Sequence, residues 1–118
     1  MEEKIHTWLN HIECEAVIPQ YIIVLYFGLY ETEKGYCIYL VGSKEYNEKD
    51  DVWAEETENL PCDFFLEIES MDDWRTFQNQ IECIIREEVS RRRKSVSSPF
   101  YDKIITIGFD DGSITKIS

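Results

Sequence analysis

The chain has 118 residues, of which 12 are Lys or Arg and 24 are Asp or Glu, and its formal net charge is −12 at pH 7. Hydrophobic residues make up 43% and aromatic residues 14%. This excludes intrinsic disorder, because disordered chains combine high charge with few large apolar side chains. The length is that of one ordinary domain, so we expect a single domain over residues 1–118.

The beginning of the chain, Met-Glu-Glu-Lys, lacks the basic and then apolar pattern of a secretory signal. No apolar run approaches the roughly 18 residues that span a bilayer. We therefore expect a cytoplasmic protein without a membrane partner. The negative charge also argues against nucleic acid, whose phosphates would repel it. A basic protein surface is its natural complement, although the same charge also serves solubility.

The first predicted element is an amphipathic helix over residues 3–13, in which Ile5, Trp8, Leu9 and Ile12 form one apolar stripe. Residues 21–32 are rich in β-branched and aromatic side chains and predict a long strand. After a turn that ends at Gly35, a second strand is expected over residues 36–41. Both strands are apolar at nearly every position, so both faces should be covered, one by helices and the other by more of this chain or by a partner.

From Gly42 to Pro61 the apolar pattern stops, and we expect a charged irregular segment. Residues 62–68 fit either a short strand or an apolar plug. The pair Ser70 and Asp73 matches a capping box that would begin a second helix, which should run to about Arg93. Its expected apolar stripe consists of Trp74, Phe77, Ile81, Ile84, Ile85 and Val89.

The last predicted element is a hairpin formed by residues 103–109 and 113–118, with Asp111-Gly112 as a two-residue turn. That turn would place Ile114 on the same face as the apolar side chains of residues 105, 107 and 109. Hairpins separated by helices predict an α+β fold. We expect an antiparallel sheet of about four to five strands with two main helices packed on it.

The sequence predicts neither a cofactor nor a metal site. No Cys-x-x-Cys pair occurs, and Cys37 and Cys83 fit small buried apolar positions. His11 and Cys14, three residues apart, do not complete a ligand set, and the acidic segment lacks the alternation and glycine of an EF-hand loop. Catalytic carboxylates need rigid elements at fixed separation. Because no catalytic motif is present either, we do not expect an enzyme.

Charge is strongly polarised along the chain. Residues 44–73 carry twelve acidic side chains against Lys44 and Lys49, whereas five of the twelve basic residues lie between Arg86 and Lys94. Like charges at 4 Å repel one another by about 1 kcal/mol even in water. We therefore expect a basic partner that this segment attracts over long range.

Within the acidic segment, Tyr46 and Trp53 are the candidate anchors, since aromatic side chains supply most of the affinity at interfaces. The alternative for Trp53 is that it folds back as a lid on the core. The expected partner-binding residues are Glu45, Tyr46, Glu48, Asp50, Asp51, Trp53, Glu55, Glu56 and Glu58.

The stretch from Tyr39 to Ala54 resembles the small acidic immunity proteins of bacterial polymorphic and contact-dependent growth-inhibition toxin systems. The shared pattern is a strand that ends in Gly-Ser, then an aromatic residue, an acidic run and Trp-Ala, here Gly42-Ser43, Tyr46, Asp50-Asp51 and Trp53-Ala54. The resemblance implies a non-enzymatic protein that binds and neutralises one cognate toxin, often a nuclease. Val52 interrupts the acidic run, a departure from the pattern.

Two other classes of function stay open at this point. One is a small carboxylate-dependent enzyme, with or without a metal ion. The other is an oligomeric scaffold, in which a second copy covers the apolar strands over residues 21–30 and 36–41.

Overall fold

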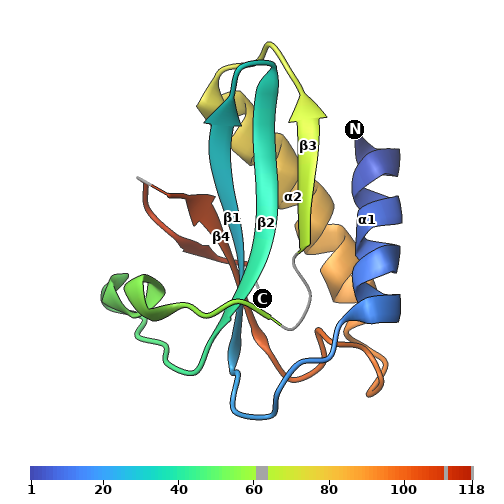
Figure 1. Cartoon of the computed structure of the whole chain (residues 1–118), viewed down its shortest axis with the longest axis vertical. Coiled ribbons are helices and arrows are strands. Elements are labelled where there is room, and N and C mark those ends of the chain that lie inside the picture. The colour runs from blue at the N-terminus through green and yellow to red at the C-terminus, as the bar shows by residue number, and fades with distance from the viewer. Residues whose placement is uncertain (61–63, 111, 118) are drawn as a thin grey trace.

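The computed structural model describes residues 1–60, 64–110 and 112–117 of the chain. In this part, two α-helices and a short 3₁₀ helix accompany one five-stranded sheet of order β3-β2-β1-β4-β5 (Figure 1). The elements are α1 (Glu2–Glu15), β1 (Val24–Thr32), β2 (Gly35–Ser43), η1 (Val52–Glu56), β3 (Phe64–Glu69), α2 (Trp74–Arg92), β4 (Ile104–Phe109) and β5 (Thr115–Lys116). The α+β class is therefore confirmed. Neither described helix is long and apolar enough to cross a membrane.

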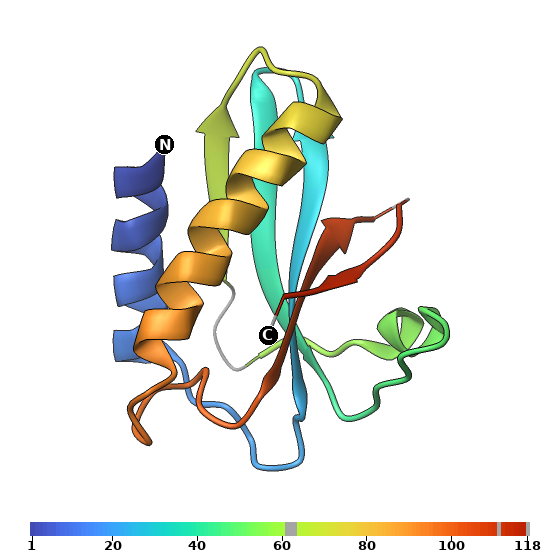
Figure 2. The same cartoon turned by 180° about the vertical axis from the view of Figure 1, so that it is seen from behind.

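Both α-helices pack on the same face of the sheet (Figure 2). The predicted stripe of α1 is buried, with Ile5, Leu9 and Ile12 fully inaccessible. On α2 the buried positions include Phe77, Ile81, Ile85 and Val89, whereas Trp74 from the predicted stripe is 49% exposed. The 3.6-residue periodicity thus located both helices and most of their core faces. Cys83, expected to be buried, is exposed on the outer side of α2.

The start of α2 differs in detail from the predicted capping box. Asp73 is the N-cap, and its Oδ1 accepts a hydrogen bond of 2.8 Å from the backbone N–H of Thr76. The Ser70 hydroxyl instead accepts from the backbone N–H of Asp72, which closes a turn before the helix. The backbone bond from Thr76 lowers the pKa of Asp73, as expected for a carboxylate at the positive end of a helix.

The strands β1 and β2 form an antiparallel hairpin, and β3 adds to β2 in the antiparallel sense. Residues 64–68 are thus part of a strand and not an isolated plug, while residues 61–63 lie outside the described part. No described glycine has a positive φ. Gly35 is instead required because the backbone of β3 at Ile68 passes where its Cβ would be.

The sheet is mostly antiparallel, but β4 lies parallel to β1. From the outer strand β3, helix α2 crosses the sheet and returns the chain beside β1 on the far side. Local hairpin signals predicted antiparallel neighbours only. The parallel pair arises because a helical connection of this length carries the chain back to the end where β1 begins.

The terminal hairpin is present with a register one residue away from the prediction. Ile107 lies opposite Thr115, whereas a two-residue Asp111-Gly112 turn would have placed it opposite Lys116. A shift of one residue turns every side chain of a strand to the other face. Ile114 therefore packs on the face away from the helices, and Ile117 joins the helix-side core in its place.

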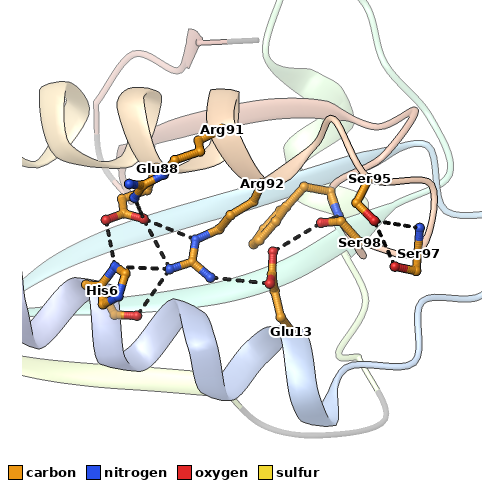
Figure 3. Close-up of polar contacts among 9 residues, drawn as sticks. His6, Glu13, Glu88, Arg91, Arg92, Ser95, Ser97 and Ser98 are labelled. Carbon is orange, nitrogen blue, oxygen red and sulfur yellow. Dashed lines mark hydrogen bonds and ion pairs between the residues drawn. The ribbon is translucent and has the colours of Figure 1, made fainter.

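The two helices are joined by an ion-pair network around Glu88 (Figure 3). Its two oxygens contact His6 Nδ1 at 2.9 Å and Arg91 Nη2 at 2.6 Å. Arg92 donates from Nε to Glu88 at 3.1 Å and reaches Glu13 of α1 at 3.4 Å. The side chain of Arg92 is only 8% exposed. The basic run at the end of α2 therefore holds α1 in place in addition to complementing the helix dipole.

Burial raises the pKa of Glu88, but the hydrogen bonds from His6, Arg91 and Arg92 outweigh it and lower that pKa to about 2. Because Arg92 is always a donor, the Nδ1 atom of His6 cannot donate to Glu88 and accept from Arg92 at once. A tautomer with its hydrogen on Nδ1 donates to Glu88, which is the shorter of the two contacts.

Candidate functional site

Residues 44–60, called the acidic segment from here on, follow the end of β2. Tyr46, Trp53 and Ala54 of this segment pack on the face of the sheet away from the helices, whereas Leu60 joins the helix-side core. Trp53 is the centre of this contact, since its ring lies 6.2 Å from that of Tyr26 and 5.4 Å from that of Tyr46. Val24, Tyr26 and Trp53 form a second, smaller apolar cluster, against which Ile104 and Ile114 also pack. This segment supplies part of the second cover that the apolar strands required.

Trp53 is only 4% exposed, so of its two interpretations the structure supports the lid. Its burial argues against the expected role as an anchoring residue, because the cluster on the sheet already covers the ring surface that a partner would contact. Tyr46 is half-buried beside it and keeps one side accessible. The sequence could not separate the two roles, because an aromatic residue in a polar loop has the same pattern in both cases.

The segment is held in shape by its own polar side chains. The carboxylate of Asp50 accepts hydrogen bonds from the backbone N–H of Val52 at 3.1 Å and from the Asn47 amide at 3.2 Å. Asp51 accepts from the backbone N–H of Ile114 at 3.2 Å and so fastens the segment to the terminal hairpin. Asp51 thus has a structural contact as well as its charge.

The other expected acidic residues are distributed around this frame. Glu45 and Glu48 are exposed, with Glu48 at 3.7 Å from the ammonium group of Lys116. Glu58 is half-buried and accepts a hydrogen bond of 2.6 Å from the Tyr21 hydroxyl. The side chains of Glu55 and Glu56 lie outside the described part of the structure. Five of the expected carboxylates, on residues 45, 48, 50, 51 and 58, therefore belong to one packed segment.

An aromatic row extends from this segment across the outer face of the sheet. The ring of Tyr26 lies 6.1 Å from that of Tyr39, which in turn lies 6.1 Å from that of Tyr30. The Tyr39 ring crosses Gly28 of β1 at the place where a Cβ would be, and its hydroxyl donates to Asp110 beyond β4. Gly28 is thus needed for a close side-chain approach and not for an unusual backbone angle.

The hydroxyl groups of Tyr26 and Tyr39 are bonded inside the molecule. The Tyr26 hydroxyl donates to the carbonyl oxygen of Gly108 at 3.2 Å, and burial raises the pKa of Tyr26 to about 12. Burial and the hydrogen bond to Asp110 likewise raise the pKa of Tyr39. Both phenols are therefore neutral near pH 7 and act as fixed donors, so this part of the row is rigid.

The far half of the same face is left open by the acidic segment. Tyr30 is 44% exposed, and Phe65 of β3, which pairs with Tyr39 in the sheet, is 62% exposed. Glu67 and Glu69 follow Phe65 at alternate positions and are exposed beside it. We call this area, with Tyr30, Tyr39, Phe65, Glu67 and Glu69, the open face. Sequence analysis missed it, although the alternation of buried Phe64 and Ile68 with outward residues would have indicated Phe65.

Among the described residues, no group of three or more His, Cys, Asp or Glu side chains could hold a metal ion. Asp73 and Glu88 have lowered pKa values, the opposite of what a general acid requires. The acidic segment and the open face together present carboxylates next to accessible aromatic rings, which is the composition of a protein contact surface.

Comparisons with known proteins add no assignment to this geometry. A scan against protein-family models, a search of curated protein sequences and a search of solved structures each found no match.

Proposed function

We propose that this protein is an immunity-type inhibitor that neutralises a cognate toxin by binding a basic surface of that toxin directly. The observation that carries the proposal is the juxtaposition of the acidic segment with the open face. One supplies negative charge on a packed loop, and the other supplies exposed aromatic surface on rigid strands.

Charge and aromatic surface have different roles in this proposal. Exposed carboxylates such as Glu45 and Glu48 raise the association rate through long-range attraction, but they add little affinity once salt screens them. Phe65 and Tyr30 are exposed to solvent and stand on a sheet, so they can be desolvated by a partner with little loss of conformational entropy. Together the two surfaces combine the charge that fast association requires with the aromatic contact area that slow dissociation requires.

A nuclease fits this surface as the target. Enzymes that act on nucleic acids are basic where they contact phosphates, and a row of carboxylates presents a similar sign of charge. The resemblance of residues 39–54 to immunity proteins of toxin systems supports the same class of partner.

The first test is to express the chain with the product of its adjoining open reading frame. A one-to-one complex by light scattering and rescue of cell growth are expected, and failure to form a complex even at low ionic strength would refute the proposal.

Charge reversal in the acidic segment should slow association with that toxin by roughly tenfold at low salt and flatten its salt dependence. The suitable variant is Glu45→Lys with Glu48→Lys, because both side chains are exposed, whereas Asp51 is bonded to the hairpin. Stopped-flow or surface-plasmon measurements over a salt series provide the rate constants.

The matched control makes the same change of net charge on α1, with Glu3→Lys and Glu15→Lys. Both residues are exposed, and their effects on the helix dipole have opposite signs. If the control slows association as much as the test variant, net charge and not the acidic segment governs the encounter.

Removing the aromatic anchor of the open face should accelerate dissociation instead. Phe65→Ala is expected to weaken the complex about tenfold, chiefly through its dissociation rate, with little change in stability because the ring is 62% exposed. Tyr101→Ala, which removes a 45% exposed aromatic ring outside this face, is the control. Equal affinities of Phe65→Ala and the unmodified protein would show that the open face is not part of the interface.

A further inference from the structure

A hollow lies apart from the acidic segment, between the first turns of α2 and the β4–β5 hairpin, elements that Figure 2 shows from the helix side. Its volume is about 710 Å³, within the range of small-molecule sites. Leu29 and Phe109, paired at the carboxyl ends of the parallel strands β1 and β4, contribute to its wall. The other lining residues used below are Glu31, Trp74, Gln78 and Asp110.

The aromatic wall of the hollow is built from Trp74 and Phe109. Their rings meet edge to face with centroids 5.9 Å apart, and Trp74 is 49% exposed at the beginning of α2. This ring already attracts a cation within the molecule, since the guanidinium carbon of Arg75 lies 5.3 Å from its centroid. Arg75 is not among the lining residues, so the side of Trp74 that faces the hollow is available.

The polar part of the lining is negative. Glu31 and Asp110 contribute carboxylates, Gln78 contributes an amide, and no Lys or Arg is found among the described lining residues. A hollow with aromatic walls and carboxylates that no lining Lys or Arg neutralises favours a group that is positively charged at one end and apolar along its stem.

We infer that this hollow binds an alkylguanidinium or alkylammonium group, which in the proposed complex is the side chain of an arginine or lysine of the toxin. The charged end lies between Glu31 and Asp110, and the methylene stem packs on Phe109 and Trp74. That the cation belongs to the toxin rests on the proposed function. That the hollow prefers a cation rests on its lining alone. The site adds a pocketed contact at the border of the open face, with which it shares Tyr30.

The test is an NMR titration of the intact protein with N-acetyl-arginine amide. The indole N–H of Trp74 should shift in a saturable manner at millimolar concentrations, while the buried indoles of Trp8 and Trp53 should not respond. N-acetyl-citrulline amide, which has the same shape without the charge, is the matched ligand and should not bind. No saturable shift, or equal binding of citrulline and arginine, would overturn the inference.

Variants assign the contacts within the hollow, and their binding is followed through the backbone N–H of Gln78 in the lining, because Trp74→Ala lacks the indole reporter. Trp74→Ala should weaken the arginine probe about two- to fivefold, as expected for the loss of one partly exposed cation–π contact. Glu31→Gln with Asp110→Asn should weaken it further and keep an acceptor for the Tyr39 hydroxyl. Glu3→Gln with Glu15→Gln on α1, which removes the same charge elsewhere, is the control and should leave binding unchanged. Equal losses in test and control would overturn the assigned contacts.

This experiment separates the site from the function. Binding of the arginine probe without a complex with the neighbouring gene product would refute the proposed function and keep the site. A complex that forms normally although the probe does not bind would remove the site and leave the function.

Discussion

Replacing Trp53 by alanine is expected to lower the free energy of unfolding by about 3 kcal/mol, at the lower end of the range for buried aromatic residues. The side chain is 4% exposed and joins the acidic segment to Tyr26 and to the sheet. The loss should lie at the lower end because the segment can partly collapse or detach instead of leaving an empty cavity. Urea unfolding measures the total effect.

Hydrogen exchange distinguishes detachment of the segment from loss of global stability. In Trp53→Ala, the backbone N–H of Ile114 should exchange faster, since its acceptor is Asp51 of the segment. Once the loss of global stability is subtracted, the protection of the N–H groups of α1 should be almost the same as in the parent protein. Trp74→Ala, which removes a tryptophan that is 49% exposed, is the matched control and should cost far less. Equal losses in the two variants would contradict the role of Trp53 as a lid.

A large effect is also expected at the junction of the helices. Glu88→Gln should destabilise the protein by about 2–3 kcal/mol at pH 7. The substitution removes the negative partner of three charge-assisted hydrogen bonds, from His6, Arg91 and Arg92. Among the described residues, Glu13 is then the remaining carboxylate partner of Arg92. The glutamine keeps the size of the side chain, so little packing is lost. Thermal or urea unfolding of both proteins provides the difference.

The same difference should depend on pH in a defined direction. The pKa of Glu88 is lowered from 4.5 to about 2 in the folded protein, so its stabilising contribution is complete above about pH 4.5 and is lost as the pH falls toward 2. The unfolding free energies of the parent protein and Glu88→Gln should therefore converge over that range. Glu87→Gln, at an adjacent exposed position, is the control. A difference that stays constant from pH 7 to pH 3 would show that the charge of Glu88 is not what stabilises the junction.

Helices and strands that a local pattern of apolar residues determines could be predicted from the sequence. The stripe of Ile5, Leu9 and Ile12 located α1, and the aromatic and β-branched run before Gly35 located the β1–β2 hairpin. The parallel pairing of β1 with β4 was not predictable in this way, because it joins segments far apart in the sequence and leaves no local signal. The hairpin register failed for a related reason, since one residue in the turn decides which face Ile114 occupies.

The candidate site was predicted in part. The acidic segment was found from its charge, and exposed Glu45 and Glu48 lie where a partner can reach them. Trp53 was left between two roles, because only the fold shows whether the sheet face beside it is vacant. Phe65 and Tyr30 were missed for the same reason. Their exposure follows from how much of that face the segment covers, which depends on tertiary packing and not on residue type.

The frame around Gly28 and the exposed carboxylates of the acidic segment differ in how much a substitution costs in folding free energy. Gly28, Tyr39 and Asp110 form a fixed frame in which an added methyl group collides with a ring. Glu45 and Glu48 project into water, so exchanging them costs little folding free energy. Substitutions at Glu45 and Glu48 can therefore change the charge that the protein presents to its surroundings, while the frame beneath them keeps its shape.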